Sequence, residues 1–350
     1  MNTLSICDRI IGPGQPVYII AEISANHHQS FDEAVKIVRA AKAAGADAVK
    51  LQTYTADTIT IPCSRDPFLI RGTIWDGRNL HELYQEAYTP WEWQPKLMAL
   101  ARDLGLHCFS SPFDTTAVDF LEQAGVPAYK IASFELVDLP LIQYVARTGK
   151  PMIMSTGMAT LAETEEAVHA ARGAGATQIA LLKCTSGYPA DPAEMNLRTI
   201  GDLAARLDVP VGLSDHTLGT AVPVAAVALG ATIVEKHITL SRATPGPDSA
   251  FSLEPSEFRA MVDGVRVAEK ALGKAYYEIG DAEKKSRVFR RSLFVVEDVK
   301  AGEVFTERNV RSIRPANGLP PKHLATVLGR HAACDIERGT PLDWPLVGES

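Results

Sequence analysis

A regular alternation of short apolar runs and amphipathic helical stretches begins at Val17 and continues for roughly 250 residues, the usual length of a (β/α)8 domain. The apolar runs have the length of buried strands, and the stretches between them carry apolar residues at helical spacing. Eight such runs are Val17–Ile23, Ala48–Thr53, Cys108–Pro112, Ala128–Ser133, Met152–Thr156, Ile179–Thr185, Val209–Ser214 and Thr232–His237. The pattern predicts an α/β fold, a (β/α)8 TIM barrel. An open doubly wound sheet is the alternative, which eight regular repeats disfavour.

Helices are expected between these strands, among them Glu33–Ala44, Gln94–Leu104, Leu161–Arg172 and Ser256–Leu272. Several stretches end in glycine just before the next strand, at Gly45, Gly105 and Gly125. A glycine at this place suits the left-handed conformation in which many helices terminate.

One connection is much longer than the others. Residues 54–93 separate the second strand from its helix and include the aromatic residues Trp75, Tyr84, Tyr88, Trp91 and Trp93. Long loops in compact folds are commonly lids or binding loops, and loops after barrel strands lie on the active face. We therefore expect part of this insertion to contact substrate; aromatic packing beneath the loop is the alternative.

The pattern changes after Leu272. A charged stretch at residues 280–286 leads into short segments at Ser292–Val296, Val304–Thr306 and Arg311–Arg314, with glycines between them. We divide the chain into a barrel domain, residues 1–280, and a linker with a small turn-rich domain, residues 281–350. The second domain is large enough to cover a site.

Composition excludes several classes of protein. The 350 residues carry a net charge of −7 and no basic run longer than two residues, which argues against a nucleic-acid partner. No run of about 18 uncharged apolar residues predicts a membrane span. The five cysteines are scattered without a Cys-x-x-Cys pair, so neither a disulfide framework nor a zinc knot is expected. These features predict a cytoplasmic protein.

Two histidines, His216 and His237, stand where consecutive strands end. The carboxyl ends of parallel strands share one mouth, so both imidazoles can converge on one metal ion. A hydrogen-bonded structural role is the alternative for each histidine. Two protein ligands leave positions for water and substrate oxygens, which suits a divalent metal, Mn²⁺ first, with Mg²⁺ or Co²⁺ as alternatives.

The other strands also end in polar residues. Desolvating several cations and hydroxyls in one mouth is unfavourable without an anionic ligand, so a bound phosphate or carboxylate is predicted. A structural ion pair inside the barrel is the alternative for each lysine. The residues at these positions include Glu22, Lys50, Gln52, Ser111, Lys130, Ser133, Glu135, Ser155, Lys183, Ser186 and Tyr188.

Six motifs follow one another along the chain: AEISANH at 21–27, GADAVKLQT at 45–53, AYKIAS at 128–133, STGM at 155–158, GLSDHT at 212–217 and EKH at 235–237. In this order they resemble the motifs of the sialic acid synthase family, which condenses phosphoenolpyruvate with an amino-sugar aldehyde. The end of the chain, RSIRPANG at 311–318 and LGR at 328–330, resembles the SAF (antifreeze-like, β-clip) domain fused to those barrels.

The resemblance implies roles for individual residues. Catalysis is expected from Glu22, Lys50, His216 and His237. The histidine pair would hold a metal that polarises the aldehyde, and Glu22 would position or deprotonate the attacking water. Phosphoenolpyruvate is expected to contact Lys50, Ser111, Lys130, Ser133, Ser155 and Ser186. The sugar is expected to contact Gln52, Glu135, Tyr188, Asp248 and Arg314.

Four stretches, ANH at 25–27, WDGR at 75–78, YTPWEW at 88–93 and IASFE at 131–135, resemble the pseudaminic acid branch of this family more than the neuraminate synthases. The expected acceptor is therefore 2,4-diacetamido-2,4,6-trideoxy-L-altrose, with N-acetylneuraminate or legionaminate synthesis as alternatives. Ser186 stands where neuraminate synthases often carry asparagine, a departure that changes the side chain offered to the acceptor. The family also implies a domain-swapped homodimer, in which Arg314 reaches the sugar site of the partner chain.

Two other classes of function are open. A Schiff-base aldolase on the same barrel would use Lys183 as its amine and would need no histidine pair. A binding module without enzymatic activity is suggested by the ice-binding character of the tail, although the polar strand ends of the barrel disfavour it.

Overall fold

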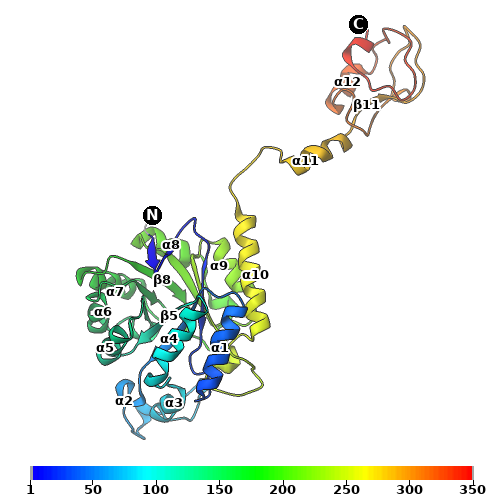
Figure 1. Cartoon of the computed structure of the whole chain (residues 1–350). Helices are drawn as coiled ribbons and strands as arrows, with labels where there is room; N and C mark the ends of the chain where they lie inside the picture. The colour runs from blue at the N-terminus through cyan, green and yellow to red at the C-terminus, as the bar shows by residue number, and fades with distance from the viewer. Residues whose placement is uncertain (1–2, 349–350) are drawn as a thin grey trace. The chain divides into compact units, whose positions relative to one another are not determined.

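The computed structural model describes residues 3–348. The chain forms two compact units, the first ending at Gly273 and the second beginning at Lys274. Figure 1 shows the first unit in blue to yellow and the second in yellow to red.

Eight parallel strands of the first unit close into a barrel in the order β10-β3-β4-β5-β6-β7-β8-β9, which confirms the predicted TIM barrel (Figure 1). The strands are β3 (Tyr18–Glu22), β4 (Ala48–Thr53), β5 (His107–Pro112), β6 (Tyr129–Ile131), β7 (Met152–Ser155), β8 (Ile179–Cys184), β9 (Val211–Asp215) and β10 (Ile233–His237). Closure sets β10 beside β3, with His237 opposite Glu22, and β3 beside β4, with Glu22 opposite Lys50.

A layer of helices surrounds the barrel (Figure 1). They are α1 (Phe31–Ala43), α4 (Gln94–Asp103), α5 (Thr115–Ala124), α6 (Leu139–Ala146), α7 (Leu161–Gly173), α8 (Thr199–Leu207), α9 (Ala221–Ala228) and α10 (Pro255–Leu272). The predicted terminating glycines Gly45, Gly105 and Gly125 have φ of 90°, 68° and 73°, in the left-handed region. Within residues 3–348, no helix has both the length and the apolar character that crossing a membrane requires.

Side chains of the barrel strands alternate between the interior and the helical layer. Ile20, Phe109 and Leu182 belong to the buried cluster inside the barrel, whereas Ile19 and Leu181 pack in the cluster shared with the helices. The strand residues two positions after the apolar interior residues also face the interior, in the carboxyl half of the barrel, and their side chains are polar. They are Glu22, Lys50, Ser111, Lys130, Ser155, Cys184, Ser214 and Glu235. We call this set the polar layer.

The amino end of the barrel is closed by a hairpin of β1 (Leu4–Ile6) and β2 (Arg9–Ile11). Leu4, Ile6 and Ile11 lie in the same buried cluster as the apolar interior residues of the strands. This end of the barrel is therefore a packed core.

The insertion at residues 54–93 is folded rather than extended, with α2 (Ala56–Ile59), η1 (Asp66–Phe68), α3 (Leu80–Ala87) and η2 (Trp91–Trp93). The Tyr54 ring packs edge-on against Tyr84 and Phe113, with ring centroids 5.6 and 5.0 Å apart. An aromatic cluster beneath the loop, the predicted alternative, is thus present.

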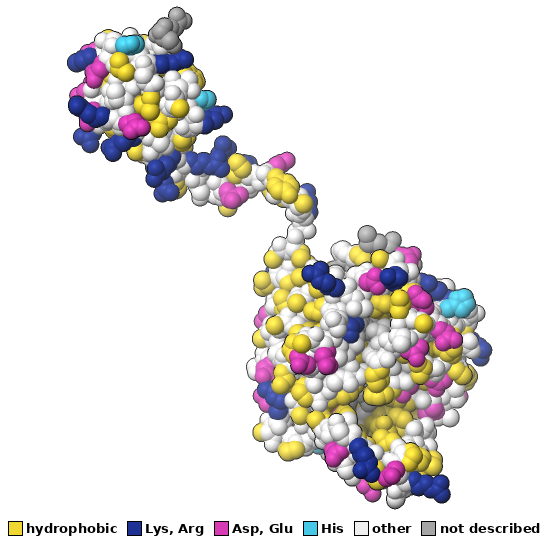
Figure 2. Space-filling view, turned by 180° about the vertical axis from the view of Figure 1, so that it is seen from behind, with side chains coloured by type: hydrophobic (Ala, Val, Ile, Leu, Met, Phe, Trp, Pro, Cys, Tyr) yellow, Lys and Arg dark blue, Asp and Glu magenta, His cyan; other side chains and the backbone are white. Residues whose placement is uncertain are grey.

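The second unit contains α11 (Asp281–Ser286), η6 (Arg287–Phe289), the antiparallel pair β11 (Ser292–Val295) and β12 (Val310–Ile313), η7 (Pro321–His323), α12 (Leu324–Val327) and η8 (Trp344–Leu346). In the segment Val304–Thr306, Val304 makes an isolated bridge to His331, and Phe305 is buried in the small core of this unit. Lysine and arginine side chains gather along α11 and η6 (Figure 2).

Candidate active site

Two lysines and two carboxylates meet in the polar layer. The Lys50 Nζ lies 2.8 Å from Glu22 Oε2 and 2.8 Å from Glu235 Oε1. Lys130 Nζ lies 3.9 Å from the same Glu235 oxygen and donates to Ser155 Oγ at 2.7 Å. All four charged side chains are buried. The lysines are therefore not unpaired cations. The structural ion pair that was the alternative interpretation for Lys50 is present. An anionic ligand bound here would share the lysines with these carboxylates.

Burial and neighbouring charges both shift the pKa values of Lys50 and Glu235. Burial, and to a lesser degree Lys130, lower the pKa of Lys50 to about 8, although Glu235 opposes the shift. Burial alone would raise the pKa of Glu235, but Lys130 and Lys50 hold it below its ordinary value. Lys50 is thus charged at neutral pH and close to the point at which it loses its proton.

Four serine hydroxyls lie at or just after the carboxyl ends of the strands from β5 to β8, and we call Ser111, Ser133, Ser155 and Ser186 the hydroxyl cradle. Ser133 and Ser186 lie with their Oγ atoms 3.0 Å apart. A Cβ built on Gly157 would come within 2.2 Å of Ser186 Oγ and 2.9 Å of the Ser133 Cβ, so only glycine fits. Among residues 3–348, the buried Ser111 hydroxyl has no hydrogen-bond partner. A free hydroxyl beside close-packed backbone and Lys130 is a suitable place for phosphate or carboxylate oxygens.

Glu22 is fully buried at the end of β3. Gln52 Nε2 donates to Glu22 Oε1 at 3.2 Å and to Ser24 Oγ at 3.1 Å. Lys50 and Gln52 thus hold the Glu22 carboxylate from two sides.

The two histidines converge, as the sequence predicts, with ring centroids 5.3 Å apart. His216 Nδ1 lies 3.0 Å from the Thr185 carbonyl oxygen, which can only accept, so Nδ1 carries a proton, and in the neutral ring Nε2 then has a free lone pair. The buried Nδ1 of His237 has no hydrogen-bond partner within the described part of the chain.

The surroundings shift the pKa values of the two rings in opposite directions. Burial, together with His216 and Lys50, lowers the pKa of His237 far below its ordinary value, which keeps this imidazole neutral. Burial also lowers the pKa of His216, but Cys184 and the Thr185 carbonyl outweigh it and raise the value overall.

These side chains fit a metal that takes few protein ligands. A neutral imidazole with an unpartnered nitrogen and a second with a free lone pair are suitable donors. Among residues 3–348 no group of three or more His, Cys, Asp or Glu side chains forms a metal-binding cluster. The remaining positions of a cation held here would belong to water or substrate.

An aromatic wall made of Trp75, Tyr188 and Phe251 adjoins the histidines. Tyr188 packs on His216 and on Phe251, with centroid distances of 4.5 and 5.0 Å. Trp75 packs on Tyr188 at 5.5 Å, and its Nε1 donates to the Pro247 carbonyl at 2.9 Å. The insertion thus contributes Trp75 to the mouth.

Two acidic residues border the wall. Burial raises the pKa of Glu135 to about 7, and its Oε2 is buried with no hydrogen-bond partner in the described chain. Asp248 accepts hydrogen bonds from Ser24 Oγ and from the Ala25 amide, so it also anchors the turn after β3.

Of the predicted site residues, Lys183 does not face the barrel interior and Arg314 lies in the second unit. Lys183 falls on the outward positions of β8, between the interior residues Leu182 and Cys184, and its Nζ donates to the Cys184 carbonyl at 2.8 Å. Its expected place in the mouth is wrong, which removes the basis for a Schiff-base aldolase. Arg314 belongs to the second unit, where its side chain is exposed.

Sequence reasoning missed Glu235, Ser214 and Cys184 as interior residues. Glu235 stands two residues before His237, and Ser214 stands two before His216. Because strand side chains repeat every second residue, each histidine already indicated its interior neighbour.

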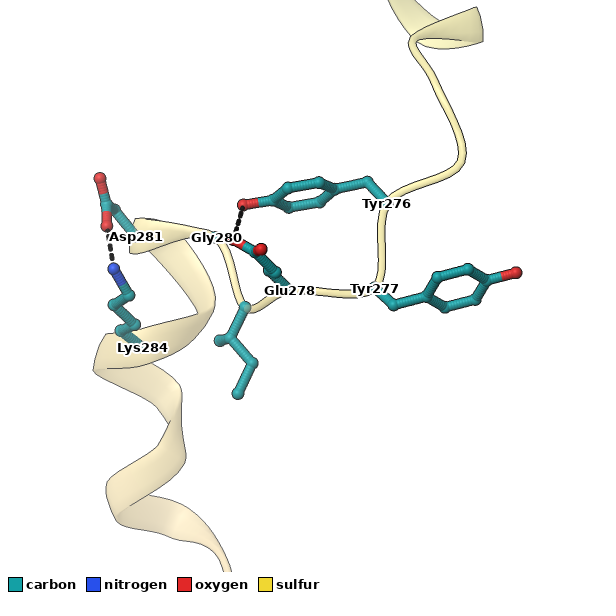
Figure 3. Close-up of a pocket in the computed structure, with 7 residues that line it drawn as sticks. Tyr276, Tyr277, Glu278, Gly280, Asp281 and Lys284 are labelled. Atoms are coloured by element: carbon teal, nitrogen blue, oxygen red, sulfur yellow. Dashed lines mark hydrogen bonds and ion pairs between the residues drawn. The ribbon is translucent and has the colours of Figure 1, made fainter.

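Figure 3 shows a separate shallow hollow at the start of the second unit, lined by Tyr276, Tyr277, Glu278, Gly280, Asp281 and Lys284. Its charged groups already have partners, since Lys284 pairs with Asp281 at 2.7 Å and Glu278 accepts a hydrogen bond from the Tyr276 hydroxyl at 3.5 Å. The Tyr277 ring points away into solvent and is 98% exposed. This hollow offers no converging polar groups comparable to the polar layer.

The NeuB family model matches residues 37–277, and the SAF domain model matches residues 290–347. A pseudaminic acid synthase of Campylobacter jejuni is 46% identical over 326 residues, which cover 93% of this chain and 95% of that protein. The N,N'-diacetyllegionaminic acid synthase of Legionella pneumophila is 34% identical over 338 residues, covering 95% of each chain. A crystal structure of the N-acetylneuraminic acid synthetase of Leptospira borgpetersenii, in complex with citrate, aligns with a TM-score of 0.73 at 29% identity over 81% of this chain and 95% of that one.

Proposed function

The chain belongs to the NeuB family, and we propose that it is a pseudaminic acid synthase that condenses phosphoenolpyruvate, 2,4-diacetamido-2,4,6-trideoxy-L-altrose and water to pseudaminic acid and phosphate. The observation that carries the proposal is the polar layer with Glu22 and two lysines, together with the histidine pair that follows it at the carboxyl ends of β9 and β10. Identity favours this acceptor over the legionaminic acid precursor, at 46% against 34%.

Phosphoenolpyruvate would bind along β4 to β8. Lys50 and Lys130 supply positive charge for its phosphate and carboxylate, and Ser111, Ser155 and the Ser133–Ser186 pair supply hydroxyls. An entering anion would draw Lys50 from Glu22, because both compete for the same ammonium group.

The reaction forms a bond from C3 of phosphoenolpyruvate to the aldehyde carbon, while the C=O double bond of the aldehyde opens and its oxygen takes up a proton to become a hydroxyl group. The positive charge that develops at C2 is captured by water, and phosphate then leaves with cleavage of its C–O bond. Glu22, released from Lys50, would take the proton of that water, while Gln52 keeps the carboxylate in place.

His216 and His237 would hold the divalent metal, for which we propose Mn²⁺, with Mg²⁺ and Co²⁺ as alternatives. A cation bound there would polarise the aldehyde oxygen as a Lewis acid.

The aromatic wall suits a 6-deoxy sugar. The rings of Trp75, Tyr188 and Phe251 offer apolar faces that can pack against a C6 methyl group. Glu135 and Asp248 stand beside the wall and can accept from acetamido N–H groups or hydroxyls.

The SAF domain would complete the sugar site. Its exposed Arg314 can donate to an N-acetyl carbonyl, and we propose that it does so in the partner chain of a swapped homodimer. Mixing re-equilibrated Glu22→Gln and Arg314→Ala chains tests this, since each mixed dimer then holds one site with both defects and one with neither. Partial recovery of turnover supports the exchange, and no recovery contradicts it.

The acceptor is tested by phosphate release from phosphoenolpyruvate across three aldehydes: the altrose derivative, the legionaminic acid precursor and N-acetylmannosamine. We expect the altrose derivative to have the highest kcat/KM, by about a hundredfold over a sugar with a C6 hydroxyl group, the limit for rejection by apolar packing. Equal or higher kcat/KM with N-acetylmannosamine contradicts the assignment.

A further inference from the structure

A buried ion pair lies behind the two histidines, on the opposite face of the barrel wall. Asp215 on β9 and Lys236 on β10 are directly paired in register. Each stands next to a histidine in sequence, so its side chain leaves the strand on the side facing the helices. Both side chains are 0% exposed.

The pair holds the backbone that carries His216. Lys236 Nζ donates to Asp215 Oδ2 and to the carbonyl oxygen of Thr217. Asp215 Oδ1 accepts from the Thr217 amide at 2.9 Å. Thr217 follows His216, so the turn after the histidine is fixed through both its amide and its carbonyl group.

The same contacts tie this turn to β10. Lys236 immediately precedes His237, and the backbone of His237 is held in turn by the Leu253 amide, which donates to its carbonyl at 3.0 Å. The separation of the two imidazoles therefore depends on a cross-strand link that touches neither ring.

Stability alone does not account for such a pair. Removing two charges from water costs much of what their attraction returns, and apolar pairs of similar volume are often as stable. Ligands of a metal, by contrast, must be held within roughly 0.5 Å of a productive arrangement.

We propose that Asp215 and Lys236 are positioning residues that set the spacing of His216 and His237 for a divalent cation. This inference rests on the proposed metal site. It predicts that replacing the pair by apolar residues leaves a folded barrel whose affinity for the cation is reduced.

The test uses the full-length double variant Asp215→Val/Lys236→Met, with Mn²⁺ as the probe. The Mn²⁺ dissociation constant is measured from the electron paramagnetic resonance signal of free Mn²⁺, and phosphoenolpyruvate binding by calorimetry. We expect Mn²⁺ to bind about 10–100-fold more weakly, the range found when groups supporting metal ligands are removed. Phosphoenolpyruvate affinity should stay within about twofold, since Lys50, Lys130 and the hydroxyl cradle are untouched.

Tyr129→Phe is the matched control, because it removes another polar contact on the outer face of the barrel, the 2.6 Å bond to Glu122, from a strand without a histidine. It should bind Mn²⁺ like the parent. If the double variant does not fold, Asp215→Asn keeps the size and one acceptor of the side chain and should still weaken Mn²⁺ binding severalfold.

The outcomes separate the inference from its premise. A folded variant that binds Mn²⁺ as tightly as the parent overturns the positioning role alone. A parent chain that binds no Mn²⁺, Mg²⁺ or Co²⁺ overturns the metal site and this inference with it.

Discussion

The two halves of the barrel interior are built on the same strands but from opposite kinds of residue. Toward the amino ends, Ile20, Phe109 and Leu182 pack with the β1–β2 hairpin into a closed apolar core. Two residues further along two of these strands, the same inward positions hold Glu22 and Ser111. The same strands thus join a half that stabilises the fold to a half whose buried charges form ion pairs with one another.

This contrast predicts different responses to substitution. Changes in the apolar half should alter the free energy of unfolding and leave chemistry intact, as expected for the stability face of a barrel. Changes in the polar layer should alter turnover or binding with small effects on stability.

The largest effect is expected for Glu22→Gln, which keeps the shape of the side chain but removes the base. Turnover should fall by about 10²–10⁴, the usual range for a positioned general base. The melting temperature should stay within a few degrees. A variant that unfolds, or that turns over normally, would place Glu22 outside the chemistry.

Loss of either histidine should come next. His216→Ala or His237→Ala should release bound metal and lower kcat by about a hundredfold or more, since a Lewis acid contributes several kcal/mol. His107→Gln is the control at the opposite end of the barrel, where His107 Nδ1 meets the Tyr18 hydroxyl at 2.7 Å. Full activity after exhaustive chelation would contradict a metal-dependent reaction.

A pair of substitutions on β7 tests the boundary between the halves directly. Ile153→Val removes one buried methyl group from the apolar half and should lower the free energy of unfolding by about 0.5–1.5 kcal/mol with unchanged KM. Ser155→Ala removes the acceptor of Lys130 and should raise the KM for phosphoenolpyruvate about two- to tenfold, the equivalent of one hydrogen bond. The same KM for phosphoenolpyruvate in both variants would contradict the distinction between the apolar half and the polar layer.

The smallest effect concerns Glu135. Its pKa is about 7 in the folded chain because of burial, so between the ordinary carboxyl pKa and pH 7 the unfolded chain binds fewer protons than the folded one. The parent should therefore lose stability as pH rises through this window, while Glu135→Gln should not. We expect the difference in melting temperature, variant minus parent, to increase by on the order of 2 °C between pH 4.5 and pH 7.5. A constant difference across this range would show that Glu135 titrates normally.

The barrel and the histidine pair were predictable because both are encoded locally. Each strand is a short apolar run, and His216 and His237 stand at the ends of two consecutive ones. Which side chains face inward was harder to predict. Strands buried on both faces read as continuous apolar runs, so the pattern around Lys183 does not show which face it occupies.

Contacts that depend on closure were also beyond the sequence. The Lys50–Glu235 pair exists because β10 and β4 flank β3, and Trp75 meets Tyr188 only through the fold of the insertion. Such pairings form only in the tertiary structure, so no local sequence pattern predicts them.

The proposed condensation is tested most directly by following oxygen through the reaction. The full-length chain is incubated with phosphoenolpyruvate, the altrose derivative and Mn²⁺ in ¹⁸O-labelled water, and phosphate and sugar acid are examined by mass spectrometry. We expect equal amounts of both products, with the label at C2 of the sugar acid and none in phosphate, because water attacks carbon and the C–O bond breaks. Labelled phosphate, or phosphate released without a sugar acid, would contradict the proposed condensation.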